Sequence, residues 1–180
     1  MKGGYKVEPE LTTMCYIERD GEYLMLHRTK KQNDPNHDLW LGIGGHFENG
    51  ETPGECIKRE VKEETGLTLI EPELRGMVTF SDGDWHELMF LFSATDFHGE
   101  LLPCNEGDLL WVEKQRVLHQ LPIWEGDRIF LSLMEQDKPF FSLKLTYSHR
   151  RLQEVLLNGK PFTDRNLWDP GTETPPARKE

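Results

Sequence analysis

Short hydrophobic runs separated by turn residues predict paired β-strands along much of the chain. Two β-rich runs within residues 11–29 flank Asp20-Gly21, a dipeptide that favours a tight hairpin because both of its residues tolerate positive φ angles. A second pair of strands is predicted at 74–80 and 87–97, joined by a turn at Asp82-Gly83. Two further apolar runs predict strands at 109–112 and 139–147.

The clearest helix is predicted between residues 51 and 67. Thr52 can cap its start, Glu55 completes a capping box with Thr52, and Gly66 ends it. A second helix is predicted at 125–136. Strands before and after a central helix, with another helix late in the chain, predict an α/β fold in which helices cover both faces of a mixed β-sheet.

The composition narrows the class of protein. The chain has 21 Lys and Arg residues against 32 Asp and Glu residues, a formal net charge of −11, which disfavours a nucleic-acid polymer as partner because such partners need a basic face. The longest apolar run, Leu88–Phe92, is far shorter than the about 20 residues of a membrane helix, and the first residues lack the apolar stretch of a signal peptide. Three cysteines without a CxxC pair indicate reduced thiols. We therefore expect a cytoplasmic protein with no membrane partner.

Three carboxylates share one side of the first helix. At 100° per residue, Glu60, Glu63 and Glu64 fall within an arc of about 100° that borders the apolar stripe of Ile57 and Val61. Glu60 and Glu64 are a like-charge pair four residues apart, which costs roughly 0.2–0.5 kcal/mol in an isolated helix. A divalent cation with oxygen ligands relieves that repulsion, although a solvated acidic face explains the helix alone as well.

The segment before this helix favours the metal interpretation. Glycines allow the backbone to approach a ligand closely, and the start of a helix attracts an anion. Together with the carboxylates, these features indicate a polyphosphate site in which Mg²⁺ bridges an acidic protein to an anionic ligand.

Residues 45–67 read GHFENGETPGECIKREVKEETGL and match the Nudix box without a mismatch. The chain therefore resembles the Nudix hydrolases, and the resemblance implies an α/β/α sandwich with a mixed sheet, Mg²⁺ or Mn²⁺ as cofactor, and cleavage of a nucleoside diphosphate linked to another group. It also implies that Glu60, Glu63, Glu64 and the carbonyl of Gly44 bind the metal. In the same way Glu60, Glu63 and Arg59 are implied as catalytic residues. Glu106 is a candidate for an extra acid outside the box, and an ordinary glutamate on a surface loop is the equal alternative.

Segments outside the box resemble the MutT-type group that hydrolyses oxidised purine triphosphates. They include Trp40-Leu-Gly-Ile-Gly-Gly, Leu-Met-Leu-His-Arg and Leu-Pro-Ile-Trp124-Glu-Gly-Asp127. By this likeness Trp124 stacks on the base and Asp127 meets its polar edge, the alternatives being a half-buried packing residue and an acid at a helix start. Two positions depart from the pattern: Leu41 replaces an Asn that reads the base, and His46 replaces a Lys. The substrate-binding candidates are Arg28, Trp40, Gly45, His46, Phe80, Trp124 and Asp127.

The leading hypothesis is thus a Mg²⁺-dependent hydrolase that converts a nucleoside triphosphate, 8-oxo-dGTP above all, to the monophosphate and pyrophosphate. The alternatives are a Nudix hydrolase of another nucleoside diphosphate derivative, such as a nucleotide sugar or capped RNA, and a nucleotide sensor without activity. We expect a Nudix domain at 8–147 and a partly flexible C-terminal extension at 148–180. The oligomeric state stays open, a homodimer included.

Overall fold

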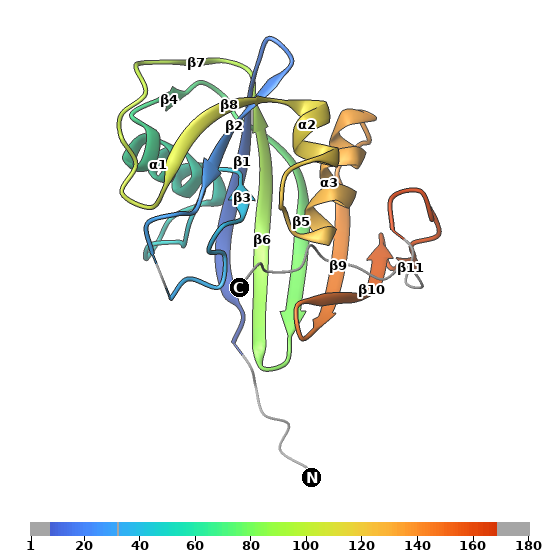
Figure 1. Ribbon diagram of the computed structural model, residues 1–180. Helices are drawn as coiled ribbons and strands as arrows, with labels where there is room; N and C mark the ends of the chain where they lie inside the picture. Colours follow the sequence, from blue (N-terminus) through green and yellow to red (C-terminus); the bar gives the residue numbers. More distant parts are fainter. Residues whose placement is uncertain (1–7, 32, 169–180) are drawn as a thin grey trace.

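The computed structural model describes residues 8–31 and 33–168, and a mixed β-sheet forms the centre of this part of the chain (Figure 1). Within it, nine strands form one sheet in the order β11-β10-β9-β5-β6-β1-β2-β3, with β8 also paired to β2. The strands are β1 (Glu10–Arg19), β2 (Glu22–His27), β3 (Trp40–Leu41), β5 (Glu73–Asp82), β6 (Trp85–Ala94), β8 (Asp108–Glu113), β9 (Phe141–Ser148), β10 (Arg151–Leu157) and β11 (Lys160–Pro161). A small separate sheet pairs β4 (Thr68–Leu69) with β7 (Phe97–His98).

The sheet is mixed because two of its pairings are parallel. β1 runs parallel to β6, with Glu10 opposite Glu87, and β5 runs parallel to β9, with Gly76 opposite Phe141. The other pairings in this sheet are antiparallel. The expected mixed α/β fold is therefore confirmed.

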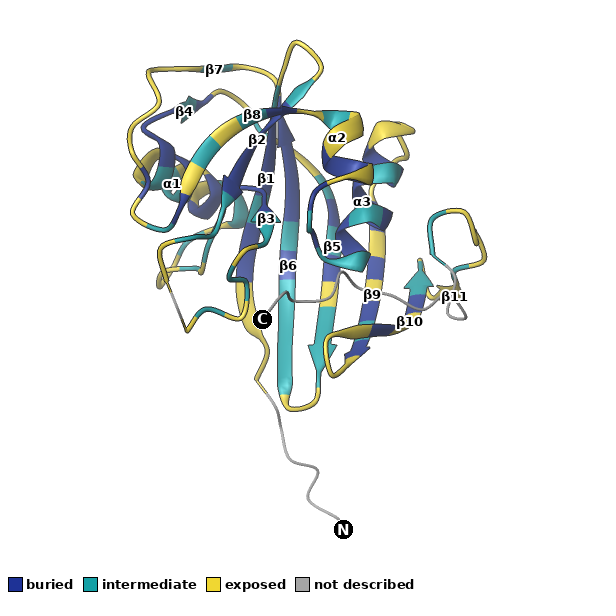
Figure 2. Ribbon diagram, in the orientation of Figure 1, coloured by how far each residue is buried: buried dark blue, intermediate teal, exposed yellow. Residues whose placement is uncertain are grey.

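Helices cover both faces of the sheet. α1 (Pro53–Thr65) lies on one side of the central strands in Figure 1, and α2 (Lys114–His119) and α3 (Glu125–Glu135) lie on the other. Successive residues of β1 point to opposite faces, so Cys15 packs with the apolar side of α1 and Tyr16 packs with α3. Figure 2 shows the resulting band of buried residues along the middle of the sheet, which gives way to partly exposed residues where β5 and β6 meet.

The local signals of the sequence are largely realised. β1 and β2 form the expected hairpin, with Asp20 at φ 50° and Gly21 at φ 81°. Thr52 and Glu55 form the capping box of α1, and Gly66 closes the helix in a left-handed conformation. The second helix and the four later strands lie where they were expected, with ends that shift by one to three residues. The second hairpin turn is at Gly83-Asp84, one residue later than predicted, because Asp82 still pairs with Trp85.

Some elements were not anticipated. They are the short helix α2, the two-residue strands β3, β4 and β7, and the strands β10 and β11. β10 and β11 follow the expected domain boundary at 147 and extend the same sheet, because β10 pairs with β9. Of the extension at 148–180 that was expected to be partly flexible, residues 169–180 lie outside the described residues. Among the helices described, none has the length and apolar character to cross a membrane.

A candidate nucleotide and metal site

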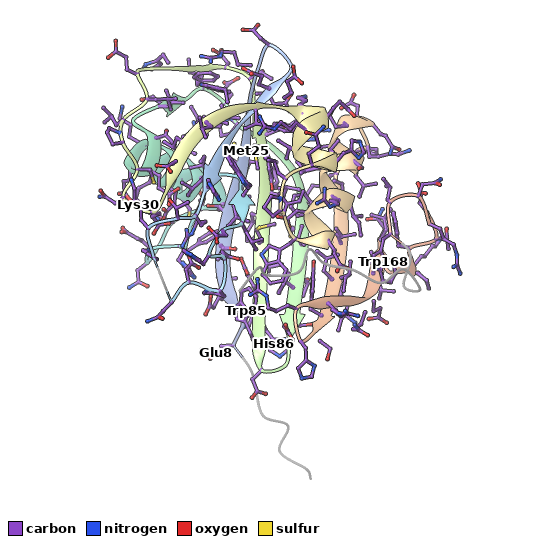
Figure 3. The ribbon with its side chains drawn as sticks, viewed as in Figure 1. Glu8, Met25, Lys30, Trp85, His86 and Trp168 are labelled. Atoms are coloured by element: carbon purple, nitrogen blue, oxygen red, sulfur yellow. The ribbon has the colours of Figure 1, made fainter. Side chains whose placement is uncertain are left out.

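A cavity of about 410 Å³ opens between α1, the sheet and α3. Its acidic end is formed by Gly44, Glu60, Glu64 and Glu106, and its aromatic end by Phe80, Trp85, Trp124 and Asp127. In Figure 3, Trp85 lies near the lower end of β6, and Lys30 lies in the loop that follows β2.

The first helix delivers two of its three predicted acids to the cavity. Glu60 and Glu64 line it, and the side chain of Glu60 is 14% exposed. Glu63 lies outside the lining residues, and its side chain is 59% exposed. The three carboxylates therefore share a side of the helix, as their spacing predicts, but two of them face the cavity and one faces solvent.

Two glycines let the backbone approach the helix closely. Ile43 and Gly45 pair with β1 through their backbone groups, so the peptide groups of Gly44 between them point away from β1. The backbone N–H of Gly44 interacts with the carboxylate of Glu64 and opposes the rise of its pKa. A Cβ on Gly45 would lie 2.5 Å from the Glu60 carboxylate, so any larger residue at this position would displace that acid.

Glu64 is the most perturbed acid at this end of the cavity. Burial, and then the nearby charges of Glu106 and Glu60, raise the pKa of Glu64 from 4.5 to about 8. Its Oε2 is buried and has no hydrogen-bond partner among the described residues. A buried oxygen without a partner is costly for a protein to keep, which indicates that Glu64 is shaped to receive a ligand.

Arg59 joins the acids of the box to one another. Its guanidinium donates to Glu51 at 2.6 Å, to Glu60 at 2.7 Å and to the backbone carbonyl of His46 at 3.0 Å. Glu63 follows Arg59 by four residues and therefore lies on the same side of the helix, where its carboxylate accepts from the guanidinium at 3.2 Å. The hydrogen bond from Arg59 is the main reason why the pKa of Glu51 falls to about 2. Arg59 lies outside the residues that line the cavity, so it orients the acids from behind.

Glu106 enters the acidic end from the loop before β8. Its carboxylate forms ion pairs with Arg28 and Lys31, and all three side chains line the cavity. Arg28 is held in turn by Asp34, whose Oδ2 accepts from Nε at 2.6 Å. Two cations and an acid from distant segments therefore meet beside Glu64.

The residues at this end fit a divalent metal ion by their chemistry. As they stand, no three acidic, imidazole or thiol groups among the described residues are gathered closely enough to hold a metal. Ion pairs with Arg59, Arg28 and Lys31 account for Glu60 and Glu106, while the orphaned oxygen of Glu64 stays available. Carboxylate and carbonyl oxygens are the ligands that Mg²⁺ prefers. Glu60, Glu64, Glu106 and the carbonyl of Gly44 are the groups that would hold it.

The aromatic end is assembled from separate strands and a helix start. Trp124 immediately precedes α3 and meets Phe80 of β5 edge to face, with ring centroids 5.7 Å apart. Phe80 also contacts Trp85 at 4.7 Å and stacks with Tyr147 of β9 at 4.5 Å. Trp124 is half-buried and its Nε1 donates to Asn36 at 2.9 Å. The cluster leaves an aromatic wall on one side of the cavity.

A buried acid, Asp127, and a half-buried one, Glu87, lie against this wall. Asp127, in the first turn of α3, is 9% exposed, and burial together with the charge of Glu87 raises its pKa from 3.8 to about 8. Burial also raises the pKa of Glu87, although a hydrogen bond from Thr12 opposes that shift. At neutral pH the carboxyl of Asp127 therefore carries its proton and can both donate and accept hydrogen bonds.

The sequence reasoning missed Trp85 and Glu87 as lining residues. Glu87 was expected only as the start of a strand, yet it occupies the same face of β6 as Met89 and Leu91, which pack under α3. An acid at an inward position of a strand is a signal that could have found it. No comparable signal marks Trp85.

The remaining candidates divide between the cavity and its surroundings. Arg28, Gly45, His46 and Phe80 line the cavity, with His46 at an exposed position where its ring lies 3.1 Å from Glu10. Trp40 does not line it; its indole stacks on His27 with centroids 4.4 Å apart, and its backbone N–H donates to the carbonyl of Pro122. The stack on His27 and the pairing of β3 with β2 hold Trp40 outside the cavity.

Comparison with known proteins places these features in a family. The NUDIX domain model matches residues 9–134, which is more than half of the chain. The chain is 31% identical over 144 residues to an uncharacterized Nudix hydrolase, YvcI, from Bacillus subtilis, covering 76% of this chain and 85% of that protein. It is also 31% identical over 133 residues to an oxidized purine nucleoside triphosphate hydrolase from Danio rerio, covering 73% of this chain and 83% of the relative. Among solved structures, a mutator MutT protein from Bacillus halodurans superposes with a TM-score of 0.74 at 30% identity, covering 84% of this chain and 99% of that one.

Proposed function

The chain belongs to the Nudix hydrolase family, whose members act on pyrophosphate bonds, and on that premise we propose that it is a Mg²⁺-dependent nucleoside triphosphate pyrophosphohydrolase that prefers an oxidised purine such as 8-oxo-dGTP. The products would be the nucleoside monophosphate and pyrophosphate. One observation carries the proposal: a single cavity joins an acidic end suited to metal and phosphates to an aromatic end suited to a base.

The acidic end supplies the chemistry in this proposal. Bound Mg²⁺ would withdraw charge from the phosphoryl oxygens and acidify the attacking water. Glu60 and Glu64 would be its main ligands, and Arg59 keeps Glu60 in place through the 2.7 Å contact. Glu63 is exposed and bonded to Arg59. Because it lies outside the cavity, it could accept a proton from the attacking water only if the substrate extended past the cavity. Of these two acids, Glu64 is therefore the better placed to act on a substrate inside the cavity.

The cations around Glu106 would serve the phosphates. Arg28 and Lys31 line the cavity and are both paired with Glu106. If Glu106 served as a metal ligand, these two cations would lose their acidic partner and could meet phosphate oxygens instead. Asp34 keeps the guanidinium of Arg28 in position during that exchange. A net charge of −11 is therefore compatible with an anionic substrate.

The aromatic end would recognise the base. Trp124 offers an aromatic face for stacking, which any base can use. Asp127 adds a protonated carboxyl at neutral pH, and this group distinguishes bases by the donors and acceptors on their edges. The likeness to the oxidized purine nucleoside triphosphate hydrolase of Danio rerio supports an oxidised purine as that base.

A nucleotide panel tests the proposal. The purified chain is incubated with the four common dNTPs, 8-oxo-dGTP, ADP-ribose, a nucleotide sugar and capped RNA, with Mg²⁺ or with a chelator, and the products are separated by chromatography. We expect the highest kcat/KM for 8-oxo-dGTP, monophosphate and pyrophosphate as products, and no turnover with the chelator. A preference for another nucleoside diphosphate derivative would rule out the proposed substrate. Binding without turnover would indicate a nucleotide sensor.

A further inference from the structure

The turn between β9 and β10 carries a charged residue to the aromatic end. Ser148 pairs with Arg151, so the hairpin loop consists of His149 and Arg150 alone. Their φ angles are 52° and 65°. Two-residue loops with two positive φ angles favour Asn-Gly, and residues with larger side chains adopt that conformation at a cost of order 1 kcal/mol each.

The carboxylate of Asp82 holds this turn. It accepts the backbone N–H of His149 at 3.2 Å and that of Arg150 at 2.9 Å. Asp82 is the last residue of β5, and β5 also contributes Phe80 to the aromatic end. The unfavourable turn is thus fixed to a strand of the site, which indicates that the direction of its side chains matters.

Arg150 reaches from this turn to Trp124. Its guanidinium carbon lies 4.4 Å from the centroid of the indole, and its Nη1 donates to the carbonyl of Pro35 at 2.6 Å. Trp124 lines the cavity and Arg150 does not, so the guanidinium covers a part of the indole that the cavity leaves free. A cation over an indole is attracted by the ring and restricts its movement.

The same contacts fix the loop beside the indole. Pro35 is bonded to Arg150 and Asn36 to Trp124, while Asp34 holds Arg28 at the acidic end. The backbone N–H of Asn36 also donates to Asp34 at 2.9 Å. Residues 34–36 are therefore tied to the indole on one side and to a phosphate-binding candidate on the other.

We propose that Arg150 is a positioning residue for the nucleobase, which supports the indole of Trp124 from outside the cavity so that its other surface stands ready for stacking. The proposal rests on the proposed function, because it requires a base at the aromatic end. It also gives a role to a residue beyond 9–134, the range that the family model matches.

The experiment compares Arg150→Ala and Arg150→Gln with Arg151→Ala, a matched control that removes the same charge from the next residue, which is exposed. KM and kcat are measured for the preferred nucleotide and for ribose 5-triphosphate, which lacks a base, and thermal unfolding is recorded. We expect KM for the nucleotide to rise about three- to tenfold in both Arg150 variants, with kcat within about twofold of the wild type. Ribose 5-triphosphate should show no such change. The Arg150→Ala change should also add little in a Trp124→Ala background, because the two residues act together.

Three results would overturn the inference. They are equal KM values in the Arg150 and Arg151 variants, an equal effect on the substrate without a base, or loss of folding in both Arg150 variants, which would make the residue structural. The failure of the proposed function is a separate result, since the wild-type protein would then hydrolyse no nucleoside triphosphate at all.

Discussion

The two ends of the cavity are built in different ways. The acidic end comes mainly from one continuous stretch, Gly44 to Glu64, in which Arg59 binds several neighbours within 13 residues along the chain. The aromatic end draws Phe80, Trp85, Trp124 and Asp127 from β5, β6 and the start of α3, and Tyr147 of β9 supports it. The acidic end therefore follows mainly from the local sequence, whereas the aromatic end depends on how distant segments pack together.

On this basis the acidic end would carry out the reaction and the aromatic end would select the base. The acids of one helix keep their spacing independently of the residues at the aromatic end, so they can serve one reaction on many substrates. A wall assembled from distant segments changes whenever one of those segments changes. We therefore expect substitutions at the acidic end to act on kcat for every substrate, and substitutions at the aromatic end to act on the choice of base.

The largest effect is expected for Glu64→Gln. The substitution keeps the size of the side chain and removes a charge that would bind the metal, so kcat should fall roughly 10²- to 10³-fold for every substrate in the panel. Stability should not fall, because the carboxylate that is lost is buried and its Oε2 has no partner among the described residues. Steady-state kinetics with Mg²⁺ and thermal unfolding in a chelator measure the two quantities. Glu100→Gln, at an exposed position, is the control. Unchanged turnover would show that Glu64 is not a ligand.

Neighbouring glycines should separate activity from folding. A Cβ on Gly45 would meet only the movable end of Glu60, so Gly45→Ala should fold and lose activity by about 10- to 100-fold. A Cβ on Gly44 would overlap the backbone carbonyl of Thr13 in β1, so Gly44→Ala should fold poorly. Circular dichroism, urea unfolding and kcat distinguish these outcomes. In Gly54→Ala, where nothing lies within 4 Å, both properties should be retained. If Gly45→Ala is fully active, Glu60 does not need its observed position.

The same contrast explains what could be predicted from the sequence. Capping, the arc of carboxylates and the contact of Arg59 with Glu63 follow from helix geometry, so residues 51–67 were predicted almost completely. The orientation of Glu63 toward solvent was not, because it depends on how α1 sits on the sheet. Family likeness also indicated Glu106, Phe80, Trp124 and Asp127, each of which lines the cavity.

Positions that depend on strand pairing could not be predicted in this way. Trp85 and Glu87 enter the aromatic end because β6 pairs with both β1 and β5, a parallel and an antiparallel contact that no local pattern specifies. Trp40 was placed at the substrate from its likeness alone, and the stack on His27 holds it elsewhere. Arg150 lies on a hairpin turn within a region expected to be an extension.

A smaller effect is expected for the pH dependence of stability in Asp127→Asn. The pKa of Asp127 is raised to about 8 by burial, so the unfolded chain releases this proton at a lower pH than the folded chain. The free energy of unfolding of the wild type should therefore fall as the pH rises through the window between about 4 and 8. Asn cannot ionise, and the variant should gain about 2–3 kcal/mol relative to the wild type between pH 6 and pH 9.

Urea unfolding at these two pH values, in a chelator, measures the difference. Part of the wild-type slope should remain in the variant, because the pKa of Glu64 is also raised to about 8. Asp96→Asn, a change of the same chemistry at an exposed position, is the control. An identical pH dependence in Asp127→Asn and the wild type would mean that the Asp127 carboxyl ionises normally.

The smallest effect is expected at His46, even though it lines the acidic end. Its side chain is 69% exposed and lies 3.1 Å from Glu10, which competes with any phosphate for a protonated ring. The group of His46 that matters to the acids is the backbone carbonyl, which accepts from Arg59 at 3.0 Å and which His46→Ala retains. KM and kcat for the preferred nucleotide should therefore change by about twofold or less. A tenfold rise in KM would place the imidazole on the phosphates. It would also show that substrate binding at the acidic end depends on a side chain outside α1.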